Sequence, residues 1–247
     1  MQNSKTVAAN IFETRPLYLQ VHGRLIGFLV SSTWKPGQMI PNEIELARDF
    51  GVSVGTMRKA LQTLTDQGLL VRRQGRGTFV AEVQPLDAVP LDNLRTARDE
   101  PLHWAPQNSE ITVAIATEEE LAALGLSEGD SVFRLRRVLR DAETTSMMLE
   151  HCVLPQKMFA GLDADRESQQ LPVAQMSRRY GILVGPGTEC VTLHTADAKE
   201  AALLDAKRGD GLMKLVRIAR SFDGYPVEFR IAFCNLRMGA TYSTRIR

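Results

Sequence analysis

The chain has 247 residues, enough for two domains, and its hydrophobic content of 44% includes no apolar run long enough to span a membrane. The first residues carry no lysine-led apolar segment, so we expect no secretory signal, no membrane partner and a cytoplasmic location. The three cysteines, Cys152, Cys190 and Cys234, form no group at ligand spacing with the four histidines, which predicts buried thiols in a reducing cytosol and neither a metal site nor another cofactor.

The net charge of +1 is unevenly distributed along the chain. Residues 1–82 contain ten Lys or Arg against six Asp or Glu, a balance of +4, whereas residues 83–247 contain 20 against 23, a balance of −3. Positive charge therefore gathers at the N-terminal end, where it can neutralise the phosphates of a nucleic acid.

The segment from residue 41 to residue 80 predicts two helices around a tight turn, followed by a short basic hairpin. Apolar residues at helical spacing define the first helix, which Gly51 ends, and Ser53 can cap the second helix by accepting from the backbone N–H of Gly55 or Thr56. The expected buried face of the second helix is Met57, Leu61, Leu64 and the later Leu69, with Gly68 at its end, and the exposed face is Thr56, Arg58, Lys59 and Gln62.

The hairpin is predicted to pair residues 69–73 with residues 78–81, with residues 74–77 as its turn. Two glycines let this turn approach another surface closely, and Arg76 places a charge at its tip. Apolar spacing over residues 18–29 predicts a further helix packed beneath the pair. A basic helix face is often only solvated, but this complete ordered set is typical of a winged helix that inserts one helix into the major groove of DNA.

Residues 17–81 resemble the N-terminal winged helix of the GntR family of bacterial transcription regulators. The stretches LYLQV, KPGQMIPNEIELARDFGVS, MRKALQTLTDQGL and RRQGRGTFV carry this resemblance. It implies that the start of the recognition helix and the wing contact double-stranded operator DNA. The predicted DNA-binding residues are Glu43, Ser53, Gly55, Thr56, Arg58, Lys59, Gln74, Gly75, Arg76, Gly77 and Thr78.

Two positions depart from the family pattern. Ile44 and Val54 stand where members of the family usually have a basic residue. An arginine that forms two hydrogen bonds to guanine contributes about 1–3 kcal/mol of base discrimination. We therefore expect a different half-site from the usual one, or greater dependence on the wing and on DNA shape.

A linker is predicted between two domains. Residues 83–109 contain four prolines, mixed charges and no sustained periodicity, which favours an extended connection. The expected organisation is a DNA-binding domain at residues 13–82, this linker, and a second domain at residues 110–247.

The second domain contains an internal repeat of residues 116–154 in residues 195–233. Gly129-Asp130 matches Gly209-Asp210 and Arg137 matches Arg217 at an offset of 80, and Glu150 is aligned with Glu228 at an offset of 78 after a shorter hairpin. Each copy predicts a capped short helix, a turn and two strands joined by a hairpin. Thr117 with Glu120 forms a capping box, Asp197 is the second cap, and Asp223-Gly224 is a hairpin turn.

Alternation along the strands predicts a one-faced antiparallel sheet covered by helices on its apolar side. Phe133, Leu135 and Leu139 are assigned to the apolar face. The opposite face is expected to gather Arg134, Arg136, Glu150, Glu228 and Arg230. That face is either an ordinary solvated sheet surface or a pocket in which arginines pair with an anionic ligand.

Residues 110–240 resemble the UTRA effector-binding domain of the HutC subfamily of GntR regulators, a fold similar to chorismate lyase. The stretches FRLRRVLRD, MMLEHCVLP, RRYGI and DGYPVEF carry it. It implies an α+β protein in which Arg134, Arg136 and Glu228 hold a small effector such as a sugar phosphate or a carboxylate. Leu171, followed by Pro172, stands where sugar-phosphate binders commonly have a serine, which favours an amphipathic carboxylate at least as strongly.

Two functions follow from these patterns. The first is a transcription regulator, more often a repressor, that binds a pseudo-palindromic operator as a homodimer and responds to a small anionic metabolite. Edge strands of the second domain are the natural candidates for the dimer contact. The second is a chorismate-lyase-like enzyme acting on an aromatic carboxylate with Glu228 as base. Against it, the sequence contains no nucleophile, metal or phosphate-loop motif.

Overall fold

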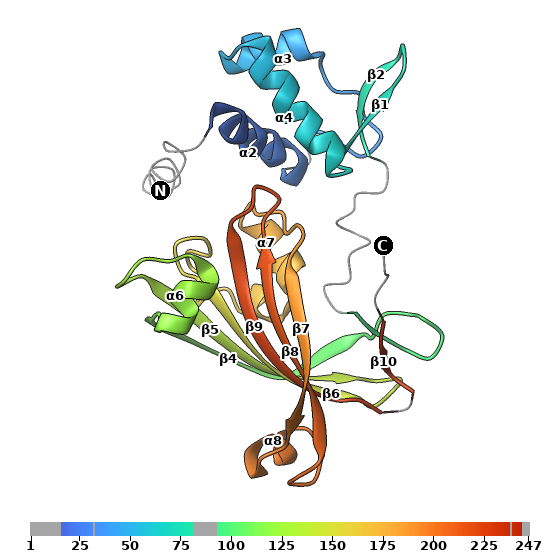
Figure 1. Ribbon diagram of the computed structural model, residues 1–247, viewed down its shortest axis with the longest axis vertical. Helices are drawn as coiled ribbons and strands as arrows, with labels where there is room; N and C mark the ends of the chain where they lie inside the picture. The colour runs from blue at the N-terminus through green and yellow to red at the C-terminus, as the bar shows by residue number, and fades with distance from the viewer. Residues whose placement is uncertain (1–15, 32, 82–92, 238, 244–247) are drawn as a thin grey trace. The chain divides into compact units, whose positions relative to one another are not determined.

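The computed structural model describes residues 16–31, 33–81, 93–237 and 239–243. The chain divides into two compact units, one built mainly from residues before position 90 and the other from residues after it (Figure 1). The first unit is largely helical and the second is dominated by an antiparallel sheet, so the protein belongs to the α+β class as predicted.

The N-terminal unit is a winged helix. Its elements are α2 (Leu17–Val30), α3 (Glu43–Phe50), α4 (Val54–Asp66) and the hairpin of β1 (Leu70–Arg73) with β2 (Gly77–Val80). The predicted apolar face of α4 is buried, with Met57 and Leu64 fully inaccessible, and it packs against α2 and α3. The helical spacing and the hairpin turn therefore identified these elements correctly.

The turn between α3 and α4 is defined by its caps. Asn42 and Glu45 form a capping box at the start of α3, and Gly51 ends that helix in the left-handed conformation at φ 67°. Ser53 caps α4 as expected, because its hydroxyl accepts from the backbone N–H of Thr56 at 3.1 Å.

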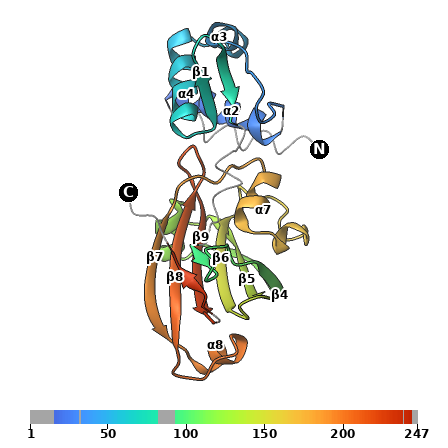
Figure 2. The same cartoon turned by 90° about the vertical axis from the view of Figure 1, so that its right-hand side faces the viewer.

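The second unit is built on a six-stranded sheet of order β4-β5-β6-β9-β8-β7, in which every neighbouring pair is antiparallel (Figure 2). Its strands are β4 (Trp104–Ile115), β5 (Ser131–Asp141), β6 (Met147–Pro155), β7 (Thr188–Thr195), β8 (Gly211–Arg220) and β9 (Pro226–Asn235). The remaining elements are β3 (Leu94–Arg95), α6 (Glu118–Leu124), the 3₁₀ turn η1 (Ser168–Gln170), α7 (Val173–Arg179), α8 (Ala198–Leu203) and β10 (Thr241–Tyr242).

The internal repeat is visible in the topology. The copies β4-α6-β5-β6 and β7-α8-β8-β9 meet at the centre of the sheet, where β6 pairs with β9. Capping boxes begin both short helices, Thr117 with Glu120 at α6 and Asp197 with Glu200 at α8. The repeat therefore duplicates one supersecondary unit on each half of the sheet.

The strand register corrects one part of the predicted alignment. Arg137 stands opposite Glu150 in the first copy, and Arg217 stands opposite Arg230 in the second. Glu150 is therefore equivalent to Arg230, at an offset of 80, and not to Glu228. A register shift at Ala219 and Arg220 absorbs the shorter second hairpin, so the remaining residues of the strands keep the offset of 80.

The two faces of the sheet are covered by different elements. Helices α6 and α8 pack on one face, against apolar residues such as Val153, Phe229 and Leu149. The other face carries the apolar cluster of Leu139, Met148 and Leu215 with Leu94 and Leu102, and η1 and α7 lie over its polar part. Both faces are therefore covered, whereas the sequence predicted only one.

The predicted linker is shorter than expected. Residues 83–92 lie outside the described residues, but residues 94–95 form β3 and residues 104–109 form the first half of β4. Proline did not prevent strand formation, because Pro106 lies beside a register irregularity on an edge strand, where the ladder needs no amide hydrogen from it. The second unit thus begins well before residue 110.

Candidate functional site

The exposed side of α4 and its N-terminus carry the predicted helix contacts with DNA. Ser53, Gly55, Arg58 and Lys59 are exposed and Thr56 is half-buried. The Ser53 and Thr56 hydroxyls lie 2.9 Å apart, and Ser53 also caps the helix, so these two side chains are held in one local arrangement.

Arg58 is held in place by Glu43 from the preceding helix. Its Nε lies 3.1 and 3.2 Å from the two Glu43 carboxylate oxygens, and its Nη2 lies 2.5 Å from one of them. Hydrogen bonding from Arg58 lowers the pKa of Glu43 below its ordinary value. The Arg58 side chain is nevertheless 61% exposed, so the pair orients a guanidinium that remains open to solvent.

Lys59 is directed differently from Arg58. Its ammonium lies 3.9 Å from the ring centroid of Tyr18, the second residue of α2. This cation–π contact ties Lys59 to the α2–α4 packing. Of the two predicted basic contacts on α4, Arg58 is therefore more available to DNA than Lys59.

The wing presents an exposed turn that contains two glycines. Gln74, Gly75, Arg76 and Gly77 are exposed and Thr78 is half-buried. Gly75 and Gly77 have φ values of 68° and 111°, which a residue with a side chain adopts only under strain. These two positions therefore require glycine for the turn itself.

A groove of about 620 Å³ separates the wing from the start of α3. Its walls include Arg72, Arg73 and Gln74 on one side and Asn42 and Glu43 on the other. Four of the five predicted wing residues and Glu43 thus border one concave surface, with Arg72 and Arg73 beside them; Arg76 is not among the residues that line it.

Ile44, one of the two departures from the family pattern, is 66% exposed on α3. A large apolar side chain occupies this surface position where a basic one is usual. Because Ile44 is exposed, the expectation of a half-site that differs from the usual one still stands as a prediction.

The second candidate site is a group of buried charges at the centre of the sheet, which we call the charge cluster. It consists of Arg137, Glu150, Arg217, Glu228 and Arg230, each no more than 5% exposed. Burying ionised groups is costly unless they are paired, and here every member has an oppositely charged partner. Removing these charges from water therefore costs free energy, which the ion pairs within the cluster must offset.

The pairs within the cluster differ in length. Arg137 Nε donates to Glu150 at 2.6 Å, and Arg217 Nε and Nη2 lie 3.0 and 2.9 Å from Glu228 Oε2. Arg230 lies 3.3 Å from Glu150 and 3.5 Å from Glu189. Arg230 is thus shared between two carboxylates at longer distances than the other two arginines.

Arg137 also forms hydrogen bonds with the segment that covers the cluster. Its Nη1 donates to the backbone carbonyls of Gln169 and Leu171, at 3.0 and 2.7 Å. These residues belong to η1 and the turn that follows it. The guanidinium therefore joins the sheet to the chain above it.

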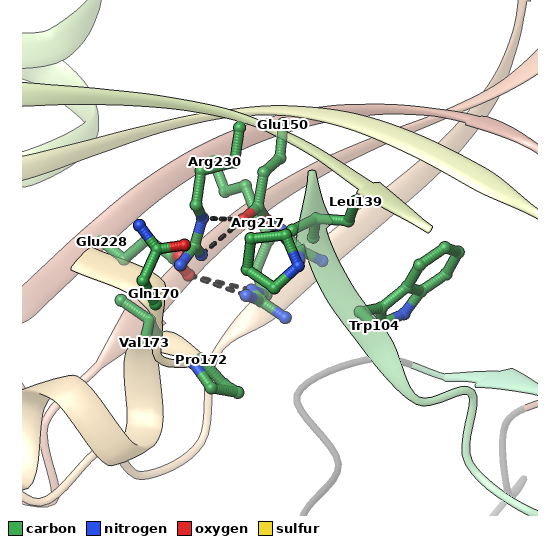
Figure 3. A pocket seen from close by; sticks show the side chains of 11 residues that line it. Trp104, Leu139, Glu150, Gln170, Pro172, Val173, Arg217, Glu228 and Arg230 are labelled. Atoms are coloured by element: carbon green, nitrogen blue, oxygen red, sulfur yellow. Dashed lines mark hydrogen bonds and ion pairs between the residues drawn. The ribbon is translucent and has the colours of Figure 1, made fainter. Parts of the chain in front are cut away.

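A cavity of about 60 Å³ opens beside the charge cluster (Figure 3). Apolar side chains complete it, with Trp104 and Leu139 from the sheet and Pro172 and Val173 from the covering segment. The fully buried Glu228 lines this cavity, and its Oε1 has no hydrogen-bond partner. A buried acceptor without a donor is unfavourable, so Glu228 Oε1 is available to a donor that enters the cavity.

The predicted effector residues do not share one face. Glu150, Glu228 and Arg230 come together as expected, but Arg134 and Arg136 lie on the helix-covered side. Cross-strand partners point to the same face, and the partner of Glu150 is Arg137, whereas Arg136 stands opposite His151. The prediction that all five gather on one face is therefore wrong.

Arg134 and Arg136 have other surroundings. Arg134 binds Glu120 of α6 through Nε and Nη2 at 2.7 and 2.8 Å, which lowers the pKa of Glu120. Arg136 is 43% exposed and lies 3.9 Å from Glu110. The first is a link between sheet and helix, and the second is a surface residue.

Two cluster residues, Arg137 and Arg217, were missed from the sequence. Both were matched in the repeat, and continuing the alternation from Leu135 to Leu139 places Arg137 on their face. The error came from assuming that a covered face contains only apolar residues. A charge repeated at the same place in two copies was the available signal.

The described residues contain neither a membrane-spanning helix nor a metal-binding cluster. Over the described ranges, the longest apolar helices fall short of what a membrane crossing requires. In the same part of the chain, no three His, Cys, Asp or Glu side chains converge as a metal site would require.

Comparison with known proteins agrees with both domains. The bacterial regulatory proteins of the gntR family match residues 17–80, and the UTRA domain matches residues 107–238. The histidine utilization repressors of Klebsiella aerogenes and Pseudomonas putida are 31% and 30% identical, covering 83% and 82% of this chain and 89% and 81% of their own lengths. The crystal structure of PhnF from Mycobacterium smegmatis superposes with a TM-score of 0.53 at 24% identity, over 92% of this chain and 99% of that one.

These relatives are regulators of transcription and not enzymes, so the lyase-like alternative is set aside. The chain belongs to the GntR family of bacterial DNA-binding regulatory proteins, as a HutC-type member that joins a winged helix to a UTRA domain.

Proposed function

We propose that the protein is a transcriptional repressor whose operator affinity is set by a small metabolite bound at the charge cluster. The observation that carries this proposal is the fully buried Glu228, whose Oε1 lacks a donor beside a cavity lined by arginines. Close relatives named as repressors support the direction of regulation. The protein acts in the cytoplasm, where the operator is accessible.

The DNA contacts are proposed at the start of α4 and in the wing. Arg58 is oriented by Glu43 and exposed, which suits a contact with a base edge or a phosphate. Arg76 and the glycines of the wing suit a close approach to the backbone of the duplex. Ser53, Gly55, Thr56, Gln74 and Thr78 border these two positions.

The effector is proposed to carry both an acid group and a hydrogen-bond donor. Three arginines face three carboxylates when Glu189 is included, so the buried charges already balance. A simple anion would add an uncompensated charge, whereas a molecule with an acid and an amine or imidazole group keeps the balance. An amino acid or a close derivative fits this description, and two relatives are named for histidine utilization.

The size of the cavity limits how such a molecule binds. About 60 Å³ is well below the roughly 300–1,000 Å³ of ordinary ligand pockets. The cavity holds one polar end of a metabolite, and the whole molecule fits only if the segment around Pro172 and Val173 moves. Binding is thus coupled to a movement of the covering segment.

A homodimer is proposed through the sheet edges. In the described part of this unit, the exposed large apolar side chains are Val113, Ile115, Val191 and Leu193, all on the edge strands β4 and β7. Leu193 is 84% exposed, and exposed apolar edges tend to pair with another strand. Leu193→Lys should therefore reduce the proportion of dimer in native mass spectrometry, and an unchanged dimer would exclude the β7 edge.

Operator binding is tested by selecting genomic fragments that the full-length protein retains. Raising the salt concentration from about 50 to about 200 mM should weaken binding by roughly 10³-fold or more if six or more phosphates are neutralised. A flat salt response, or no retained fragment, contradicts the proposal.

Effector binding is tested by thermal denaturation of the full-length protein with amino acids, their deaminated acids and sugar phosphates. A compound with an acid and a donor should raise Tm, and Glu228→Gln should remove that shift. Arg136→Ala is the matched control, because Arg136 lies outside the cluster, and it should keep the shift. Equal loss in both variants would place the ligand elsewhere.

A further inference from the structure

Two short strands tie the beginning and the end of the C-terminal unit together. Leu94 of β3 pairs with Tyr242 of β10, and the backbone N–H of Ser243 donates to the carbonyl of Asn93 at 2.7 Å. Asn93 precedes β3 and belongs to the N-terminal end of this unit, which follows the winged helix in the sequence. We call Asn93, Tyr242 and the side chain that joins them, Glu189, the entry junction.

Glu189 of β7 holds this junction with one carboxylate oxygen. Its Oε1 accepts from Asn93 Nδ2 at 3.2 Å and from the Tyr242 hydroxyl at 3.0 Å. Asn93 Nδ2 also donates to the Tyr242 hydroxyl at 3.0 Å, which closes a triangle of polar groups. The side chain of Glu189 is only 10% exposed, so these bonds face little competition from solvent.

The second oxygen of Glu189 faces the charge cluster. Glu189 Oε2 lies 3.5 Å from Arg230 Nη2, and Arg230 Nη1 lies 3.3 Å from Glu150. Arg230 lines the cavity, so two contacts join the cavity wall to Asn93. All members of this chain of contacts belong to one unit of the protein.

The distances indicate which link is easiest to change. Ion-paired hydrogen bonds of full strength measure about 2.7–2.9 Å, close to those of Arg137 and Arg217. The contacts of Arg230 with Glu150 and Glu189 measure 3.3 and 3.5 Å, which is longer. An acid group arriving in the cavity therefore competes more successfully for Arg230 than for the other two arginines.

We propose that effector binding draws Arg230 away from Glu189, and that Glu189 transmits this change to Asn93 and Tyr242 at the start of the segment that leads to the winged helix. This inference rests on the proposed effector site. Glu189 and Tyr242 act as positioning residues, since neither lines the cavity. The expected coupling is an effect of about 5–150-fold on operator affinity, the usual range for linked sites.

The first experiment needs no effector. Hydrogen exchange of the full-length protein is compared between wild type and Arg230→Lys, which shortens the side chain and weakens its reach to Glu189. Exchange should rise in peptides covering residues 93–96 and 241–243. Arg134→Lys, on the other face of the same sheet, should leave those peptides unchanged. Equal protection in wild type and Arg230→Lys overturns the proposed link.

The second experiment separates binding from transmission. Tyr242→Phe removes one hydroxyl and keeps the aromatic ring that packs beside Leu94. The compound that raises Tm in the panel above should bind this variant with a Kd within about twofold of that of wild type, as measured by calorimetry. The same compound should no longer change the operator affinity of the variant. A full operator response in Tyr242→Phe overturns the inference and leaves the effector site standing. If Glu228→Gln loses the Tm shift but Tyr242→Phe keeps the operator response, the effector site is correct and the proposed link through Glu189 and Tyr242 is wrong.

Discussion

The two domains use the same pair of residue types in opposite ways. In the winged helix, Arg58 and Glu43 are 61% and 32% exposed, and in the sheet domain Arg137 and Glu150 are 4% and 2% exposed. The exposed arginine can exchange its carboxylate for a phosphate or a base at little cost, because a surface pair contributes at most about 1 kcal/mol. The buried arginine cannot lose its partner without leaving a charge in a poorly solvated place.

This contrast separates two kinds of binding. A surface pair suits recognition of DNA, where a guanidinium must be available and correctly oriented. A buried cluster suits a switch, because a ligand that changes one pair disturbs the others in contact with it. The charge cluster includes such contacts, since Arg230 touches both Glu150 and Glu189.

The largest expected effect comes from breaking a buried pair. Glu150→Ala leaves Arg137 and Arg230 without a shared carboxylate and should lower the free energy of unfolding by about 3–5 kcal/mol. Denaturant unfolding followed by Trp104 fluorescence, in a Trp34→Phe background, measures the sheet domain alone. Glu110→Ala is the control, because Glu110 is 69% exposed and 3.9 Å from Arg136, and it should cost under about 0.5 kcal/mol. If both variants lost a similar unfolding free energy, the buried pair would be no more important for stability than the exposed one.

Breaking the exposed pair of Arg58 and Glu43 should affect DNA binding strongly and stability only slightly. Arg58→Ala should weaken binding to a selected operator by about 1–3 kcal/mol while changing the free energy of unfolding by less than about 1 kcal/mol. Binding is measured by fluorescence anisotropy at fixed salt. Arg48→Ala removes the same charge from an exposed position on α3 and should change operator affinity less. If both substitutions weaken binding equally, Arg58 contributes charge alone.

The smallest effect concerns the pair of Arg134 and Glu120, in which Arg134 is partly exposed and Glu120 is buried. Arg134 lowers the pKa of Glu120 from its ordinary value of 4.5, so ionised Glu120 stabilises the folded state above that pH. This stabilisation is lost as the pH falls through the lowered pKa. Wild type should therefore exceed Glu120→Gln in unfolding free energy near neutral pH, by less than about 1 kcal/mol because Arg134 is 37% exposed.

The same comparison at acid pH provides the check. The difference between wild type and Glu120→Gln should vanish once the carboxyl is protonated, since glutamine still supplies an acceptor for the capping box. A difference that persists in acid would mean that packing, and not charge, accounts for the effect.

Much of the winged helix was predictable because its signals are local. Caps such as Ser53, terminating glycines such as Gly51 and helical spacing act over a few residues. The duplication was also readable, because repeated motifs at an offset of 80 do not depend on knowing the fold. The start of the sheet domain was misplaced, because the prolines of residues 83–109 were interpreted as a linker, whereas Pro106 lies within β4, an edge strand that tolerates it.

The sequence by itself determined the two domains, their order, the caps, the internal repeat and the family resemblance, since each depends on contacts close along the chain or on motifs read directly. Only the tertiary structure decided which arginines meet the buried carboxylates. That choice depends on strand register, and a shift of one residue moves every side chain to the other face of the sheet. Arg137 and Arg217 therefore replaced Arg134 and Arg136 in the candidate site, and the link from Arg230 through Glu189 to Asn93 became visible only when residues far apart in sequence were brought together.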